Sequence, residues 1–170
     1  MDSQTPITTD SPGSVEVGAH VNQYLTFFLT GQEYGVDILR VQEIKGWDTV
    51  TAIPNTPEYI KGVINLRGTI VPIIDLRQRF GLAANDYGPT TVVIVVRVES
   101  ENGQSRVLGT VVDAVSDVYN VADVDLKPPP DFGSDAATGF VKGLATVDEK
   151  MVILLDIDRL VASESFQSYF

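Results

Sequence analysis

Cysteine is absent from this chain of 170 residues, and histidine occurs once. Without cysteine there is no disulfide and no thiolate metal site, a composition typical of proteins of the reducing cytoplasm. The one histidine, His20, precedes the folded part of the chain, which therefore cannot build a Ser-His-Asp or Cys-His catalytic arrangement. No GxGxxG or GxxxxGKS/T phosphate loop occurs either. The inventory of catalytic residues is poor.

Positive charge is also scarce, because 12 lysines and arginines face 23 acidic residues and the net charge is −11. Such a chain repels phosphate backbones, which argues against nucleic acids and favours protein partners. Apolar runs such as Val92 to Val96 hold about five residues, far fewer than the roughly 18 to 20 that span a bilayer. The first basic residue is Arg40, so the N-terminus lacks the positive segment of a secretory signal. We expect a cytoplasmic protein that does not enter the membrane.

What is present is the composition of one globular domain, since 44% of the residues are hydrophobic and can form a substantial core. Residues 1–22 are rich in Thr, Ser, Pro, Gly and Asp without a sustained period, which predicts a mobile tail. We assign residues 23–163 to the domain and residues 164–170 to a C-terminal tail.

The stretch YIKGVINLRGTIVPIIDLRQRF, residues 59–80, predicts a strand, a tight turn at Arg67-Gly68, a second strand and a short helix opened by Asp75. It carries four of the chain's 12 basic residues. A basic island in an acidic chain calls for an explanation.

The sequence also contains an internal repeat. The segments KGV and VPIIDL, which begin at Lys61 and Val71, match KGL and VILLDI at a constant spacing of 81 residues. Upstream, the region from Tyr34 matches that from Leu108 at a spacing of 74. Two copies of one β-rich unit, at about 24–81 and 91–162, predict a mainly β protein built from two pseudo-symmetric five-stranded barrels that share a core.

The repeat separates positions that folding needs from positions that it does not. Asp75 and Asp156 occupy the same place, where an aspartate caps the helix that follows a strand. By contrast, Arg67-Gly68 corresponds to Asp148-Glu149. Because the second copy folds without an arginine at this turn, the charge of Arg67 points to a partner.

One enzymatic alternative remains. Asp75, Asp113 and Asp156 each end an apolar strand, and three such carboxylates could hold Mg²⁺ in a metal-dependent phosphohydrolase. A short helix-like segment is also expected after each of them, so helix capping explains the three aspartates without chemistry. We therefore predict no metal site, no cofactor and no catalytic residue.

From Gln23 to about Leu160 the chain resembles one family, the chemotaxis coupling proteins called CheW. The resemblance rests on EYGVDILRVQEI, NTPEYIKGVINLRGTIVPIIDLR, TVVIV followed by GTVVDAVSDV, and the Gly-Leu turn before MVILLDID. It implies two interlocked SH3-like barrels and a non-enzymatic adaptor. Such an adaptor joins the cytoplasmic tips of chemoreceptors, the methyl-accepting chemotaxis proteins, to the regulatory domain of the histidine kinase CheA.

The resemblance also implies two partner faces. The receptor face would contain Val41, Glu43, Arg67, Val92 and Val118. The kinase face would contain Ile38, Asp131 and Phe132. A related coupling protein that serves another receptor array, for surface motility or second-messenger output, is the alternative that sequence leaves open.

Overall fold

The computed structural model describes residues 20–83, 86–100, 102–129 and 139–161. Within these ranges the chain is mainly β, as predicted. The strands are β1 Val21–Leu29, β2 Gln32–Asp37, β3 Val41–Gly46, β4 Ile60–Leu66, β5 Thr69–Asp75, β6 Val92–Glu99, β7 Ser105–Val112, β8 Ala114–Ala122, β9 Val141–Val147 and β10 Lys150–Leu155. The helical segments are η3 Ile38–Arg40, α1 Leu76–Arg79, η4 Asp123–Asp125 and α3 Ile157–Val161.

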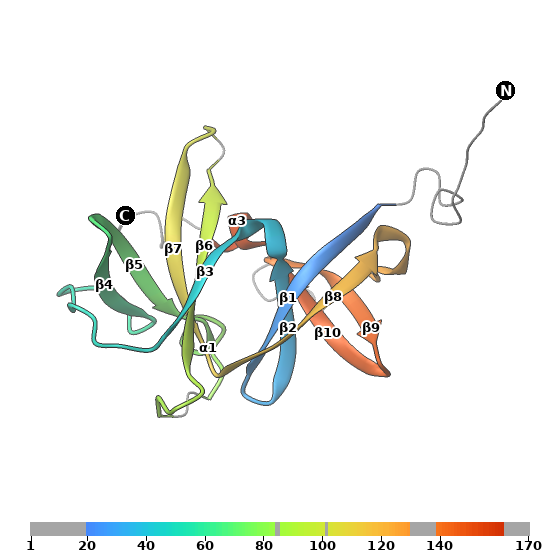
Figure 1. Ribbon diagram of the computed structural model, residues 1–170, viewed down its shortest axis with the longest axis horizontal. Helices are drawn as coiled ribbons and strands as arrows, with labels where there is room; N and C mark the ends of the chain where they lie inside the picture. The colour runs from blue at the N-terminus through green and yellow to red at the C-terminus, as the bar shows by residue number, and fades with distance from the viewer. Residues whose placement is uncertain (1–19, 84–85, 101, 130–138, 162–170) are drawn as a thin grey trace, which may run out of the picture.

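The strands form two five-stranded sheets, each of which takes strands from both halves of the chain. One sheet has the order β8-β1-β2-β10-β9, and we call it barrel A; the other has the order β3-β6-β7-β5-β4, and we call it barrel B. The β1–β2 hairpin of the first half therefore lies beside β8 and β10 of the second half (Figure 1). The β6–β7 hairpin of the second half completes the sheet of β3, β4 and β5. The predicted pair of interlocked SH3-like barrels is confirmed.

The interlocking follows from the short connections after each hairpin. Only η3 separates β2 from β3, and only Asp113 separates β7 from β8. In barrel A, β10 pairs in parallel with β2, with Leu154 opposite Gly35. In barrel B, β5 pairs in parallel with β7, with Ile73 opposite Gly109. These two pairings are equivalent under the repeat spacings of 81 and 74 residues.

The largest core cluster lies between the barrels and includes side chains of both hairpins, such as Phe27 and Ile94, together with α1 and α3 residues Leu76 and Leu160. Each barrel adds a smaller cluster of its own, one around Val71 and one around Leu154 and their neighbours. Burial of this shared apolar surface is what holds the two sheets together. None of the helices in the described ranges is long and apolar enough to cross a membrane.

In each barrel an isolated bridge joins the segment that follows one edge strand, β3 or β8, to the hairpin at the other edge of the sheet. Thr51 pairs with Val63 in barrel B, and Lys127 pairs with Leu144 in barrel A. The first bridge brings the backbone of Thr51 against Gly62, which has a φ of 141°. A Cβ at Gly62 would lie 2.1 Å from the carbonyl oxygen of Thr51. Closure of barrel B therefore depends on glycine at this position.

We expect Gly62→Ala to lower the free energy of unfolding by about 3 kcal/mol, because the methyl group collides with backbone and the positive φ is strained. Urea unfolding monitored by circular dichroism measures this loss. Gly46→Ala is the matched control, since a Cβ there meets nothing within 4 Å. Equal losses in the two variants would show that closure at Gly62 is not a steric requirement.

Candidate functional site

The candidate receptor face centres on an ion pair that links the two edges of the sheet of barrel B. Glu43 lies in β3, and Arg67 lies in the turn between β4 and β5, although β3 and β4 are at opposite edges of the sheet. Both guanidinium Nη atoms of Arg67 donate to the carboxylate of Glu43. The curl of the barrel thus brings together two residues that are 24 positions apart in the sequence.

This pair is accessible from outside. The side chain of Arg67 is 67% exposed and that of Glu43 is 27% exposed. The hydrogen bond from Arg67 lowers the pKa of Glu43 below its ordinary value, and the proximity of the two charges has the same effect. Glu43 therefore remains ionised at neutral pH, and the face presents a fixed carboxylate beside an exposed guanidinium.

The turn that carries Arg67 has a backbone conformation that does not favour arginine. Arg67 and Gly68 have φ values of 52° and 91°, and the equivalent Asp148 and Glu149 have φ values of 51° and 66°. Asn and Gly are the residues preferred in a two-residue turn with two positive φ angles. Because the fold does not call for arginine here, the observation agrees with a role of Arg67 outside the fold.

The three predicted valines lie at different places, two against the central core and one on the surface of barrel A. Val41 and Val92 are partly buried and pack against the central core, so they also support the fold. They lie at opposite ends of the β3–β6 ladder, where Val41 pairs with Val96 and Val92 pairs with Gly46. Val118 lies in barrel A, opposite Leu25 of β1, and is 42% exposed. The structure thus brings only Glu43 and Arg67 of this set into direct contact.

The candidate kinase face includes the connector between the barrels. Ile38 lies in η3 and is partly buried against the central core. Its neighbour Leu39 is 84% exposed, the highest value among the large hydrophobic residues that are exposed in the described ranges. Sequence reasoning missed Leu39 because a single leucine in a short connector has no period to show which way it points. Asp131 and Phe132 lie outside the described residues.

The carboxylates of the metal alternative do not converge. Asp75 accepts hydrogen bonds from the guanidinium of Arg77 at 2.8 Å and 3.1 Å, and the same guanidinium donates to Asp113 at 2.7 Å. Asp156 lies at the end of β10 in barrel A, whereas Asp75 and Asp113 lie at strand ends in barrel B. No three potential ligands in the described ranges form a group that could hold a metal ion. The guanidinium of Arg77 balances the two carboxylates of barrel B.

Helix capping accounts for two of the three aspartates. Asp75 accepts from the backbone N–H of Arg77 at the start of α1, and Asp156 accepts from that of Arg159 in α3. For Asp113 the capping prediction is wrong, because β8 follows it immediately. Asp113 instead accepts from the backbone N–H of Thr30, at 2.8 Å, and from Arg77.

The pKa of Asp75 is set by its burial and by its partners Arg77 and Tyr87. Burial raises the pKa of Asp75, but hydrogen bonds and charge from Arg77, with a hydrogen bond from Tyr87, outweigh it, so the pKa lies below the ordinary 3.8. Burial and the nearby carboxylate raise the pKa of Tyr87, which keeps its hydroxyl as a donor to Asp75 at 3.0 Å. The guanidinium of Arg77 is 1% exposed and lies 5.3 Å from the Tyr87 ring centre.

The fold places the four basic residues of the stretch 59–80 in different environments. Arg77 is buried and structural, Lys61 donates to Gln78 at 3.2 Å, and Arg79 lies over the rings of Tyr59 and Phe140. Of the four basic residues in the stretch, Arg67 is the exposed one. The prediction that the charge of Arg67 serves a partner is consistent with this exposure.

Comparison with known proteins identifies the family of this chain. The CheW-like domain, as a family, matches residues 23–165. The chain belongs to the CheW family. It is 50% identical over 142 residues to the chemotaxis protein CheW of Klebsiella aerogenes, covering 84% of this chain and 82% of the relative. It is 39% identical over 142 residues to the chemotaxis protein CheW of Rhizobium meliloti, covering 84% of this chain and 88% of that protein.

A solved CheW structure shares the fold. The scaffolding protein TtCheW of Thermoanaerobacter tengcongensis is 35% identical, with a TM-score of 0.74 over 86% of this chain and 91% of that one. The chain is also 29% identical over 141 residues to the protein FrzA of Myxococcus xanthus, covering 82% of this chain and 84% of FrzA. The family resemblance of the sequence is thus confirmed, and membership in a family of chemotaxis scaffolds is shown.

We expect Asp75→Asn to lower the free energy of unfolding at pH 7 by about 3 kcal/mol, because the buried guanidinium of Arg77 loses part of its counter-charge. Since the pKa of Asp75 is lower in the folded than in the unfolded protein, its ionisation stabilises the fold above pH 3.8. That stabilisation disappears as the pH falls through the folded value.

Urea unfolding of both proteins from about pH 7 down to about pH 3 tests this expectation, and the difference between them should shrink on acidification. Asp156→Asn is the matched control. It retains a capping side chain and has no guanidinium to leave unpaired, so its effect should stay below about 1 kcal/mol. A pH-independent difference for Asp75→Asn would contradict the electrostatic explanation.

Proposed function

We propose that the protein is a non-enzymatic adaptor that couples the cytoplasmic tips of chemoreceptors to the histidine kinase CheA and helps to assemble their signalling array. Membership in the CheW family supports the proposal. The observation that carries it within this chain is the exposed Arg67–Glu43 pair, which the fold does not require at that turn. The protein works in the cytoplasm and reaches the inner face of the membrane through its partners.

The receptor face consists of Val41, Glu43, Arg67, Val92 and Val118. A receptor tip is helical, and partly exposed valines can bury against the apolar side of such a helix. The opposite charges of Glu43 and Arg67 fix the register and orientation of that helix more than they add to affinity.

The kinase face consists of Ile38, Asp131 and Phe132. To these we add Leu39, because its exposure makes it available to a partner in a way that partly buried Ile38 is not. An exposed apolar side chain flanked by a charged group is a suitable anchor for a protein partner.

The mechanism is the relative placement of two partners by one rigid body. Leu39 and Val41 are two residues apart at the point where the chain passes from barrel A to barrel B. A receptor and a kinase bound on either side of this connector are held at high effective concentration and in one orientation. Coupling of about 1 to 3 kcal/mol between the two sites is typical and would favour one kinase state over another.

We expect Arg67→Glu to weaken binding to a receptor cytoplasmic fragment by about tenfold, because the variant places two carboxylates where the partner meets a cation. Co-sedimentation of the full chain with receptor fragments and CheA measures assembly, with ATP turnover by the kinase measured alongside. The variant should fold, since an exposed turn charge contributes little to stability.

The matched control is Asp148→Arg, which changes the charge at the equivalent turn of barrel A, where the φ of Asp148, 51°, is close to the 52° of Arg67. It should leave receptor binding unchanged. A large fall in melting temperature for Arg67→Glu would show instead that Arg67 is structural. Sedimentation with receptors of another pathway, and not with chemoreceptors, would favour the related coupling function.

For the kinase face, we expect Leu39→Ala and Phe132→Ala each to weaken CheA binding by about thirtyfold, because truncation of an interface anchor costs about 2 kcal/mol. Titration calorimetry with the CheA regulatory domain measures the change. Ile70→Ala is the control, because Ile70 is 61% exposed in β5 and does not belong to the proposed kinase face. Unchanged affinity in either variant would remove that residue from the interface.

A further inference from the structure

The guanidinium of Arg79, in α1, is held in place by aromatic rings. Its central carbon lies 5.4 Å from the ring centre of Tyr59 and 5.6 Å from that of Phe140. The two rings belong to the segments just before β4 and β9. Phe140 is in turn stacked on Phe80, with ring centres 4.6 Å apart. Cation–π contacts with two rings restrict the guanidinium to one position on the protein.

Arg79 has no anionic partner in the described part of the chain. The ion pairs of these ranges are formed by Arg40, Arg67 and Arg77. The Nε–H of Arg79 is the one buried side-chain donor of the described ranges that lacks an acceptor. A buried donor without an acceptor costs about 1 to 3 kcal/mol. The guanidinium has therefore already lost part of its hydration without gaining an opposite charge.

The second copy of the repeat folds without this cation. At the spacing of 81 residues, Tyr59 corresponds to Phe140 and Arg79 corresponds to Leu160. Leu160 lies in α3, is 2% exposed and belongs to the central core. An apolar side chain thus meets the needs of the fold at the equivalent place, so the charge of Arg79 calls for another explanation.

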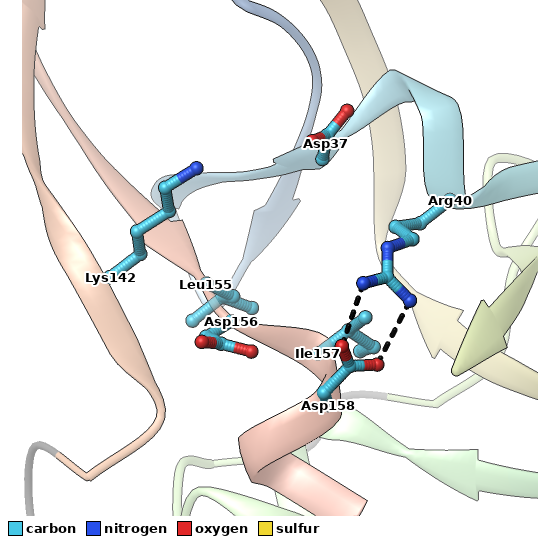
Figure 2. Close-up of a pocket in the computed structure, with 7 residues that line it drawn as sticks. All are labelled: Asp37, Arg40, Lys142, Leu155, Asp156, Ile157 and Asp158. Carbon is cyan, nitrogen blue, oxygen red and sulfur yellow. Dashed lines mark hydrogen bonds and ion pairs between the residues drawn. The ribbon is translucent and has the colours of Figure 1, made fainter. Parts of the chain in front are cut away.

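Two cations of barrel A, by contrast, are engaged within the protein. Arg40 and Lys142 border a cleft of about 190 Å³ (Figure 2). Both Nη atoms of Arg40 donate to the carboxylate of Asp158, at 3.0 Å and 2.7 Å. Lys142 donates to the hydroxyl of Tyr24 at 2.7 Å. These contacts make the cleft a junction of the fold, whereas Arg79 is fixed in position and still lacks an anion.

We propose that Arg79 anchors a carboxylate of the CheA regulatory domain, at a surface that adjoins the proposed kinase face. This inference rests on the proposed function. A planar guanidinium binds a carboxylate through two parallel hydrogen bonds. Because the rings already hold Arg79, little side-chain freedom is lost on binding. Because its Nε–H is already buried, less water has to be removed from the cation when the partner arrives.

The surroundings of Arg79 favour this partner. The segment that contains Asp131 and Phe132 of the proposed kinase face is followed in the chain by Gly139 and Phe140, so a ring that holds Arg79 adjoins that segment. Beside Arg79, Gln78 donates to the carboxylate of Glu58 at 3.4 Å. This nearby negative charge and the net charge of −11 disfavour nucleic acids and anionic membranes. A single acidic side chain on a protein fits the one cation.

The test compares Arg79→Leu with Arg79→Lys by titration calorimetry of the full chain with the CheA regulatory domain. Leucine is the residue of the second copy, so Arg79→Leu should fold while it lacks the cation. We expect it to weaken binding about tenfold, which corresponds to about 1.4 kcal/mol. Lysine keeps the charge without the planar fork, and a loss of about threefold is expected. In about 0.5 M salt the loss for Arg79→Leu should shrink to about twofold, because salt screens an ion pair and not a packing contact.

Arg106→Leu is the matched control, because it removes the same charge from another exposed position. Arg106 lies in β7 and lines a groove with Ile70, outside the proposed kinase face. Its affinity for the CheA domain should equal that of the native chain. Should Arg79→Leu fail to fold, as judged by urea unfolding, Arg79→Gln takes its place, because glutamine is also uncharged and keeps a polar end.

Equal affinities of the Arg79 variant and Arg106→Leu would overturn the inference. A loss that salt does not reduce, or one that appears with receptor fragments and not with CheA, would overturn it as well. Failure of the proposed function gives a different result, in which the native chain itself does not bind the CheA domain. That result would overturn both.

Discussion

The exchange of hairpins is the constraint on which the rest of this structure depends. Each half supplies three strands to a sheet that the hairpin of the other half completes. The connections after β2 and β7 are too short for the next strand to return to the sheet of its own hairpin. The central core consequently belongs to neither barrel alone, since residues such as Phe27 and Ile94 from different hairpins contribute to it. The relative orientation of the two barrels is therefore fixed by folding itself, which is the property that an adaptor between two partners needs.

Closure of the barrels decides which charged residues are exposed and which are buried. Curling of barrel B brings the β4–β5 turn to β3, so Arg67 meets Glu43 across the edges of the sheet. The same folding buries Arg77 between Asp75 and Asp113. Two arginines only ten positions apart thus lie in opposite environments. Arg67 is exposed at a turn, and Arg77 is buried between two carboxylates. Their common charge in the sequence carries no information about this division.

Several features of the fold and site were predictable because they depend on local chemistry. The capping aspartates Asp75 and Asp156 follow from the unpaired N–H groups at the start of a helix. The turn at Arg67 follows from its glycine and the flanking alternation. The same reasoning was wrong for Asp113, because its partners Thr30 and Arg77 are distant in the sequence. Leu39 was missed because the exposure of a connector residue depends on elements packed around it.

The sequence by itself determined the β class, the duplication, the five-stranded units and the family, since strand periodicity, turn residues and repeat spacing are properties of neighbouring positions. Only the tertiary structure decided that Val41 and Val92 share the core, that Arg77 is internal, and that Arg40 meets Asp158. These outcomes depend on which strands lie side by side. That arrangement involves contacts across more than a hundred residues, such as the pair of Arg40 and Asp158, and no local pattern records it.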